Sequence, residues 1–425
     1  MLSISKNTYL SSDILKRSAH VGNKKSTYRK EIIKQLYFHK TLSCADVSYK
    51  IGKSLPLTTK MLTELIEEDC VLEFGYANST GGRRPQMYSL RSDFMYIVSV
   101  AMDQFVSRIA IMDMQNNPVV AIEKFELTLS NNPSALSILT DKIISYIDRS
   151  GIDESKIVGI GVGMPGFVDV LKGVNYTFLD AGNHQSIEKY ISSKSGLPVF
   201  IDNDSRLIAL AELSFGSLNG KRNAMVINIG WGVGLGLVVK GELFRGQNGF
   251  AGEFSHIPLF SNNKLCSCGK MGCLETEASL FSVIEKTKEG IKNGKLSHIK
   301  ELPENHFEEA CDIIIDAAKK GDKFAIEILS DAGYHIGRGL AVLIHLLNPE
   351  IIILSGRGSR AGKLWQAPIQ QALNEHCIPR LAVGTEIQVS QLGHDAELIG
   401  AAALVMERSE KDLSKAAWLE TQLPI

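Results

Sequence analysis

The sequence predicts a mainly α-helical winged helix-turn-helix domain followed by a larger, two-lobed α/β domain. Residues 25–92 show apolar residues at helical spacing and then a hairpin pattern. A strand–turn–strand pattern at 94–127 recurs at 223–244, which indicates a duplicated α/β unit. An excess of basic residues is confined to the N-terminal end. We therefore divide the chain into an N-terminal polar tail, a head, a body and a C-terminal tail, at residues 1–24, 25–92, 93–408 and 409–425.

The composition predicts a cytoplasmic protein without a membrane partner. Of 425 residues, 44% are hydrophobic and 22% are charged, which is ordinary for a soluble chain of two or three domains. The sequence contains no uninterrupted apolar stretch of about 18 residues. Its N-terminus lacks the basic start and apolar run of a signal peptide. Seven cysteines are too few, and odd in number, so no disulfide framework is expected.

The net charge of -1 conceals an asymmetry along the chain. Residues 1–92 hold 15 Lys and Arg against 8 Asp and Glu, whereas the remainder holds 31 against 39. A basic head on an acidic body favours a nucleic-acid partner at the N-terminal end. A solvated basic face would give the same count, so charge alone does not decide.

The spacing of apolar residues in the head predicts three short helices, at residues 29–40, 43–52 and 54–69. Ser43 is placed to cap the second helix, and Gly52 to end it. Ser54 begins the third helix with Pro56 in the first turn, where a missing N–H costs little. The outer face of the third helix carries Thr59, Lys60 and Thr63. Two helices joined by a tight turn, the second polar near its N-terminal end, are typical of a helix-turn-helix.

Residues 71–90 predict a hairpin whose tip, STGGRRPQ, carries two arginines. Arginines on such a wing can contact phosphates or enter a narrow minor groove. A generic interaction module is the alternative, but charge, helix order and the arginine-tipped wing agree on DNA. The predicted DNA contacts are Ser54, Thr59, Lys60, Thr63, Arg83 and Arg84.

The sequence of the body predicts two similar sets of strands and helices. Helices follow the two strand sets at residues 133–149 and 276–292. The C-terminal third predicts a strand at 350–356 and helices at 322–347, 362–377 and from about 395. Two similar lobes leave a cleft between them, which is a common place for a ligand.

Several motifs place polar groups at this cleft. GVGMPGFVD is an apolar strand ending in a turn, where Gly166 allows the backbone to approach a ligand closely. Asn203 and Asp204 lie at a strand end before a helix, where they can bind neighbouring sugar hydroxyls and Asp204 could serve as a general base. A simple cap, with Asp204 or Ser205 starting the helix, explains this pair equally well. Glu253 and His256, three residues apart, can converge on one point.

A cysteine-rich loop predicts a metal site. His256, Cys266, Cys268 and Cys273 follow the spacing H-x9-C-x-C-x4-C. Three thiolates and one imidazole complete a tetrahedral zinc shell without an open position, so we expect structural Zn²⁺ in a loop spanning 256–273. A dithiol redox switch is the alternative, but no C-x-x-C is present and a nearby histidine favours metal. Glu275 then leaves the loop beside Glu253, so the cysteines would fix the walls of a polyol-binding pocket.

Taken together, G-x-G-x-P-G, N-D before a helix, A-G-E-x-x-H and C-x-C-G-x-x-G-C-L-E resemble the ROK family of repressors, open reading frames and sugar kinases. The resemblance covers about residues 25–405. It implies an actin-like, hexokinase-like (ribonuclease H-like) body and homodimers or tetramers. It implies that the His/Cys₃ set holds zinc and that a sugar contacts Asn203, Asp204, Glu253, His256 and Glu275, with Gly166 in the wall. The head resembles the regulator branch of the family, such as xylose-, N-acetylglucosamine- and glucose-responsive repressors.

Departures from the kinase pattern argue against catalysis. The phosphate loop D-x-G-G-T of the family's kinases becomes Ala101-Met102-Asp103-Gln104-Phe105. These side chains fill the phosphate space, and an aspartate repels phosphate. Trp231 replaces a threonine in a second loop, GWGVGLG, and the adenine-side G-G-G becomes Ser355-Gly356-Arg357-Gly358. We expect no enzyme activity, with Asp204 kept as a sugar ligand at the former general-base position.

The sequence therefore predicts a sugar-responsive transcriptional regulator, a repressor of carbohydrate-utilisation genes whose binding to operator DNA is altered by a monosaccharide or its derivative. A sugar kinase that retains a DNA-binding head, and a regulator controlled by a protein partner, are the alternatives. The sugar is not identified, because the family's P-N-L segment is absent and Asn175 and Asn183 are both candidate contacts. Repressor and activator, and dimer and tetramer, are not distinguished.

Overall fold

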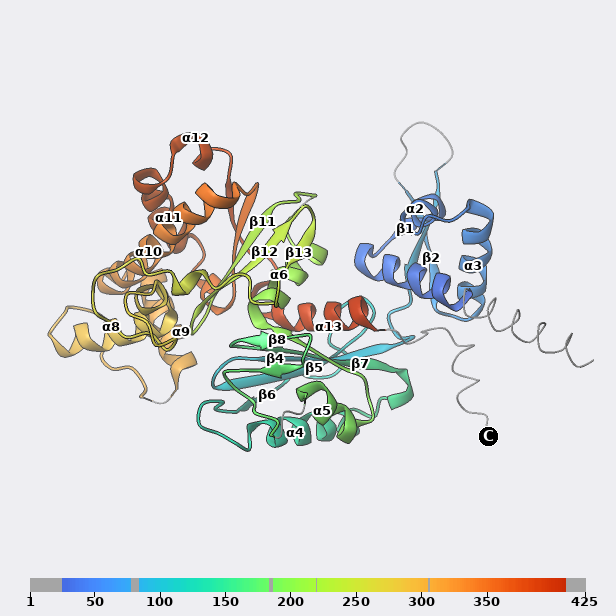
Figure 1. Cartoon of the computed structure of the whole chain (residues 1–425), viewed down its shortest axis with the longest axis horizontal. Coiled ribbons are helices and arrows are strands. Elements are labelled where there is room, and N and C mark those ends of the chain that lie inside the picture. Colours follow the sequence, from blue (N-terminus) through green and yellow to red (C-terminus); the bar gives the residue numbers. More distant parts are fainter. Residues whose placement is uncertain (1–24, 78–83, 183–185, 219, 305, 410–425) are drawn as a thin grey trace, which may run out of the picture.

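A computed structural model describes residues 25–77, 84–182, 186–218, 220–304 and 306–409 (Figure 1). The tails predicted at 1–24 and 409–425 lie outside these ranges, apart from Ser409. Figure 1 shows the head at one side of a larger, two-lobed body. Across the described ranges, no helix has both the length and the apolar character needed to cross a membrane.

The described part of the head, residues 25–77 and 84–92, contains three helices and a small antiparallel sheet. Its helices are residues 25–39, α2 (Cys44–Lys50) and α3 (Leu55–Glu67). Its strands, in the spatial order β1-β3-β2, are β1 (Leu42–Ser43), β2 (Val71–Tyr76) and β3 (Gln86–Leu90). The sequence did not predict β1, because two residues are too short to show an alternating pattern. This strand pairs Leu42 with Tyr88 and so joins the helices to the hairpin.

The caps predicted for the head helices differ in how they work. Ser43 forms a capping box with Asp46, in which each side chain accepts the other residue's backbone N–H at 3.1 Å. Gly52 follows α2 with φ of 61°, the left-handed conformation that ends a helix. Ser54 occupies the N-cap position of α3, but its side chain makes no capping hydrogen bond.

Each lobe of the body contains a five-stranded sheet of the same topology. The spatial orders are β10-β7-β4-β5-β6 and β13-β12-β11-β14-β15. In both sheets three strands form an antiparallel meander, and two later strands add in parallel beside the first strand of the meander. The duplication predicted from the strand–turn–strand pattern is confirmed.

The first lobe contains β4 (Tyr96–Met102), β5 (Val106–Met112), β6 (Glu123–Glu126), β7 (Ile157–Met164), β10 (Val199–Asn203), α4 (Ala135–Ser150) and α5 (Ile187–Ser195). A two-stranded ribbon of β8 (Val168–Asp169) and β9 (Val174–Asn175) follows β7. The strands of the second lobe are β11 (Ala224–Ile229), β12 (Val233–Val239), β13 (Glu242–Phe244), β14 (Ile351–Ser355) and β15 (Glu386–Val389). Its helices are α7 (Glu275–Ala278), α8 (Leu280–Lys292), α9 (Phe307–Lys319), α10 (Lys323–Leu347), α11 (Lys363–His376) and α12 (Pro379–Ala382).

Two helical segments of the second lobe differ from the sequence prediction. The single helix expected at 276–292 is divided into α7 and α8, because Ser279 is extended and its Oγ accepts the Ser282 N–H as the cap of α8. Helix α9 was not predicted from the sequence, although its buried Ala310, Ile314 and Ile315 have helical spacing.

Helices α6 (Asp204–Phe215) and α13 (Ala396–Arg408) lie between the two sheets (Figure 1). Their backbones touch, since a Cβ on Gly400 of α13 would lie 2.0 Å from the carbonyl oxygen of Leu207 in α6. One apolar cluster contains Ile33 and Leu36 of the head together with Val405 and Met406 of α13. The head and the body therefore share a continuous core.

Candidate functional site

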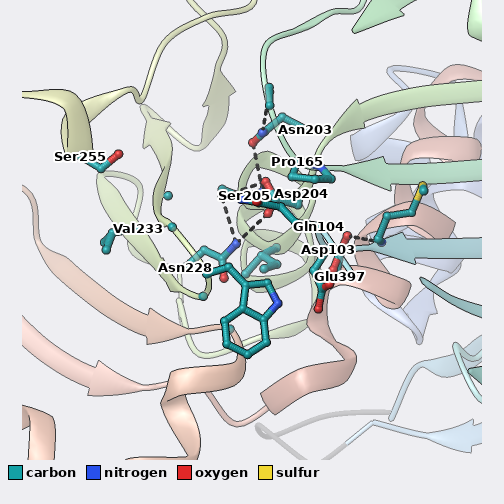
Figure 2. Close-up of a pocket in the computed structure, with 18 of the residues that line it drawn as sticks. Asp103, Gln104, Pro165, Asn203, Asp204, Ser205, Asn228, Val233, Ser255 and Glu397 are labelled. Carbon is teal, nitrogen blue, oxygen red and sulfur yellow. Dashed lines mark hydrogen bonds between the residues drawn. The ribbon is translucent and has the colours of Figure 1, made fainter. Parts of the chain in front are cut away.

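A polar cavity of about 450 Å³ lies between the lobes. Side chains from both lobes, α6 and α13 line it, and Figure 2 shows part of this lining. Every residue predicted to contact a sugar is among them, namely Gly166, Asn203, Asp204, Glu253, His256 and Glu275. Carboxylates, amides and an imidazole gathered in a cavity of this size suit a small ligand with many hydroxyl groups.

Asn203 and Asp204 divide the roles of helix cap and cavity wall. Asn203 is the N-cap of α6, and its Oδ1 accepts the N–H groups of Ser205 and Arg206. Its Nδ2 donates to the Gly166 carbonyl at 3.2 Å, which ties β10 to the turn after β7. The helix begins at Asp204, as the cap alternative allowed, but the capping residue is Asn203, which also lines the cavity.

Asp204 is the first residue of α6 and faces the cavity (Figure 2). Its Oδ2 accepts a hydrogen bond from Asn228 Nδ2 at 3.1 Å. Burial raises the pKa of Asp204 to about 6, although hydrogen bonds from Ser205 oppose the shift. The carboxyl group can thus accept a hydrogen bond from a ligand hydroxyl near neutral pH.

Gly166 has a conformation and a position that require glycine. Its φ is 92°, and a Cβ there would lie 2.8 Å from the Thr177 side chain. Asn175, one of the two candidate sugar contacts, instead shapes the adjacent loop: its Nδ2 donates to the Pro165 carbonyl at 2.8 Å, and its Oδ1 accepts the Thr177 N–H at 2.9 Å. The other candidate, Asn183, lies outside the described residues.

Glu253, His256 and Glu275 form the opposite wall. Glu253 precedes the short 3₁₀ helix η2 (Phe254–His256), and its Oε2 lies 3.8 Å from His256 Nε2. Glu275, at the start of α7, accepts hydrogen bonds from Ser255 at 3.3 Å and Ser267 at 3.4 Å. Burial raises the pKa of Glu253 to about 7, and the charges of Asp204 and Glu275 add to this shift.

The predicted metal ligands come together in one cluster. The ligand atoms of His256, Cys266, Cys268 and Cys273 all lie within 4.8 Å of one another. Cys268 Sγ is 3.6 Å from Cys273 Sγ, and Cys266 Sγ is 3.5 Å from His256 Nδ1. Zn–S bonds of about 2.3 Å and Zn–N bonds of about 2.0 Å place tetrahedral ligands at about these separations. The donor set and its spacing therefore fit a metal ion, with Nδ1 of His256 facing the cluster and Nε2 facing Glu253.

Aromatic side chains pack together beside residues 101–105, and one of them, Trp231, lines the cavity. The Phe105 ring packs against the rings of Trp231, Phe281 and Phe307 at centroid distances of 6.0, 5.5 and 4.7 Å. Asp103 Oδ1 accepts the N–H groups of Phe105 and Val106, both at 2.8 Å. These two amides are therefore not free to bind a phosphate.

Charged residues join the lobes across this aromatic group. Arg357 of the second lobe lies over the Trp231 ring at 5.5 Å and 3.9 Å from Asp103 of the first lobe. Glu308 of α9 pairs with Arg357 and also with Lys124 of β6. Asp103 and Arg357, which both line the cavity, therefore bring the two lobes together at this end of the cleft.

The predicted DNA contacts that the structure describes are all exposed. Ser54 is the N-cap of α3, and Thr59, Lys60 and Thr63 lie within this helix. The hydroxyl groups of Thr59 and Thr63 each donate to the carbonyl four residues earlier, and Thr59 Oγ1 also lies 3.3 Å from Cys44 Sγ in α2. Arg84 is exposed at the base of the hairpin tip, whereas Arg83 falls outside the described residues.

Comparison with known proteins identifies the family. The model of the ROK family matches residues 108–408, well over half of the chain. The chain belongs to the ROK family. It is 29% identical over 384 residues to a xylose repressor of Caldicellulosiruptor bescii, an alignment covering 88% of this chain and 94% of that one. It is also 33% identical over 293 residues to a glucokinase of Halalkalibacterium halodurans, covering 68% of this chain and 88% of the other.

Solved structures support the same fold. A ROK family transcriptional regulator described as a homologue of the Escherichia coli MLC protein has a TM-score of 0.72 at 24% identity, over 93% of this chain and 99% of that chain. A ROK family glucokinase from Streptomyces griseus, solved with glucose and AMPPNP, has a TM-score of 0.61 at 25% identity, over 76% of this chain and 99% of that chain. The body therefore has the actin-like, hexokinase-like fold of ROK proteins.

Two further cavity residues of this ROK protein were not predicted from the sequence. Asn228, at the end of β11, binds both Asp204 and Ser205 at 3.1 Å. Glu397, in the first turn of α13, accepts the Met102 N–H at 3.1 Å (Figure 2). Burial raises the pKa of Glu397 to about 8, and the negative charge of Asp204 adds to this shift. Asn228 could have been noticed as a polar residue beside the glycines of GWGVGLG, but Glu397 has no neighbouring motif.

Proposed function

We propose that this ROK protein is a sugar-responsive transcriptional regulator, a repressor whose binding to operator DNA is altered by a monosaccharide or its derivative. One observation carries the proposal: the polar residues predicted to hold a sugar all line one cavity, while Asp103 and Trp231 line it where the kinase pattern has small phosphate-binding residues. Such a cavity can hold a sugar, but a carboxylate and an indole ring in place of glycine and threonine do not favour the phosphates of a nucleotide.

The names of relatives support this proposal. The xylose repressor alignment covers 88% of this chain, so it must include part of the head. A further relative, covering 82% of this chain, is the DNA-binding transcriptional dual regulator NagC of Escherichia coli. The glucokinase alignment covers 68% and is short enough to fit within the body. The relatives that share the head are thus regulators.

The sugar would be held by hydrogen bonds from both walls of the cavity. Asp204 and Asn203 are adjacent on one wall, so they can bind neighbouring hydroxyls, as can Glu253 and Glu275 on the other. His256 presents Nε2 toward the cavity if Nδ1 binds a metal. We assign Zn²⁺ to the cluster, where it would hold the loop of residues 256–273 in shape and take no part in chemistry.

The head is proposed to be a winged helix-turn-helix. In this assignment α3 enters the major groove, with Thr59, Lys60 and Thr63 facing bases and phosphates. Arg84 then contacts the adjacent backbone or minor groove, the role also predicted for Arg83. A homodimer or tetramer would place two heads on two half-sites, so that a small rotation of one head lowers affinity.

The test is a fluorescence anisotropy titration of the zinc-loaded, full-length protein on DNA from its own promoter region. D-Xylose, D-glucose, N-acetylglucosamine and their phosphates are then added in turn. Under the proposal one of these sugars changes the apparent Kd by fivefold or more, a typical allosteric coupling of about 1 kcal/mol. If the protein binds DNA but no sugar changes the affinity, control by a protein partner becomes the better explanation.

A sugar kinase is the second candidate, because of the 33% identity to a glucokinase. It predicts ATP-dependent phosphorylation of one sugar in the panel by the purified protein. Measurable turnover would show that the loop of residues 101–105 still admits a nucleotide, and would overturn the assignment as a regulator without catalysis.

A further inference from the structure

Part of the contact between head and body lies at the C-terminal ends of the two central helices, and another part lies at the turn after β5. The ring of Phe38 in the head stacks on Phe215, the last residue of α6, with centroids 6.1 Å apart and an interplanar angle of 15°. Tyr37 meets the same ring edge-on at 5.5 Å and donates from its hydroxyl to Asn116 Oδ1 at 2.5 Å. Lys34 donates to the carbonyl of Glu407, near the end of α13, at 2.8 Å.

The opposite ends of the same helices lie in the cavity. Asp204 is the first residue of α6, and Glu397 is the second residue of α13. Both side chains line the cavity. The 12 residues of α6 span roughly 18 Å. Each helix therefore extends from the ligand cavity to the surface on which the head rests.

The two helices cannot move independently of each other. At Gly400 the backbone of α13 touches that of α6 at Leu207, and any side chain there would overlap the Leu207 carbonyl. Leu207 and Ala401 also belong to one buried apolar cluster. Because such close packing has few alternative arrangements, a displacement of Asp204 at one end moves Phe215 at the other.

We propose that Phe215 is a positioning residue through which the state of the cavity sets the orientation of the head. A ligand that draws Asp204 toward the opposite wall shifts α6, and the stacked rings of Phe215 and Phe38 carry this shift into helix 25–39. This inference deepens the proposed function and takes its biological meaning from it. The coupling itself is a property of the protein alone and can be tested without sugar or DNA.

The test is a double-mutant cycle followed by hydrogen–deuterium exchange of the full-length protein. Exchange is measured in peptides from residues 25–39 for the wild type, Asp204→Ala, Phe215→Ala and the double variant. We expect Asp204→Ala alone to change exchange in this helix by about fivefold or more. In a protein that already carries Phe215→Ala, Asp204→Ala should change the exchange rate of this helix by less than about twofold.

Two further variants separate coupling from simple loss of structure. Phe215→Leu keeps apolar contact with Phe38, so most of the response to Asp204→Ala should return, and this variant replaces Phe215→Ala if that protein does not fold. Phe244→Ala removes an exposed ring on β13 and should leave the response at its wild-type size. Peptides from α4 provide an internal reference.

Two results would overturn the inference: an unchanged helix 25–39 in Asp204→Ala, or an equal response with and without Phe215. Neither depends on the anisotropy experiment. If the protein bound neither sugar nor DNA, the proposed function would be wrong. The exchange measurements would still show whether Asp204 and helix 25–39 are coupled through Phe215.

Discussion

Asp204 faces the cavity from the first turn of α6, with Asn228 bound to one oxygen. We predict that Asp204→Ala weakens sugar binding by about 10- to 100-fold, the usual loss when a charged hydrogen-bond acceptor is removed. DNA binding should remain measurable, but the sugar should no longer change it. Calorimetric titration and anisotropy measure the two effects. Asp148→Ala, an exposed carboxylate on α4, is the matched control, and a normal sugar response in Asp204→Ala would contradict the assigned pocket.

We predict that the stability of the protein depends on pH, because burial raises the pKa of Glu397. Its pKa is raised to about 8 in the folded protein, whereas an unfolded chain ionises the group near pH 4.3. Between these values the folded state binds the extra proton, so the free energy of unfolding falls as pH rises, by a few kcal/mol at most. Glu397→Gln keeps an acceptor for the Met102 N–H but cannot ionise. Its melting temperature should equal that of the wild type near pH 5 and exceed it near pH 8; parallel curves would contradict the predicted shift.

At the scale of elements, the cysteine loop is expected to depend on its metal. Cys268→Ser removes one of four ligands, so zinc content should fall from about one ion per chain toward zero. The loop would then release Glu275 and His256, and both sugar affinity and melting temperature should drop. Metal analysis and thermal unfolding measure these effects. Cys44→Ser, outside the cluster, should retain its zinc. Full sugar affinity in a zinc-free protein would show that the loop needs no metal.

Local patterns predicted most elements because their signals lie within one segment. The third head helix, the two strand meanders and the long α10 each show a periodic pattern or a turn signal of their own. The cavity residues near glycine-rich motifs were predicted for the same reason. Glu397 was missed because its hydrogen-bond partner, Met102, lies 295 residues away in sequence. The sequence showed that Phe105 and Trp231 depart from the kinase pattern, but not that Phe281 and Phe307 pack around them.

At the scale of the whole molecule, the salt dependence of DNA binding should indicate how many heads contact the DNA. Each lost phosphate contact lowers the slope of log K against log salt by about 0.9. If Lys60 contacts a phosphate and a dimer places both heads on the operator, Lys60→Ala should reduce the slope by roughly 2. Anisotropy titrations at several salt concentrations measure it, with Lys292→Ala on the body as the control. An unchanged slope would remove Lys60 from the interface.

The apolar cluster that joins Ile33 and Leu36 to Val405 and Met406 limits how freely the head can be exchanged between proteins. An excised head would expose the surface that α13 and Phe215 now cover, and would be prone to aggregate. A chimaera that carries a head from another ROK regulator would need matching partners on α6 and α13. To change the DNA specificity of such a protein by replacing its head, the contact surface on the body must therefore be replaced as well, because residues 25–92 form only one side of it.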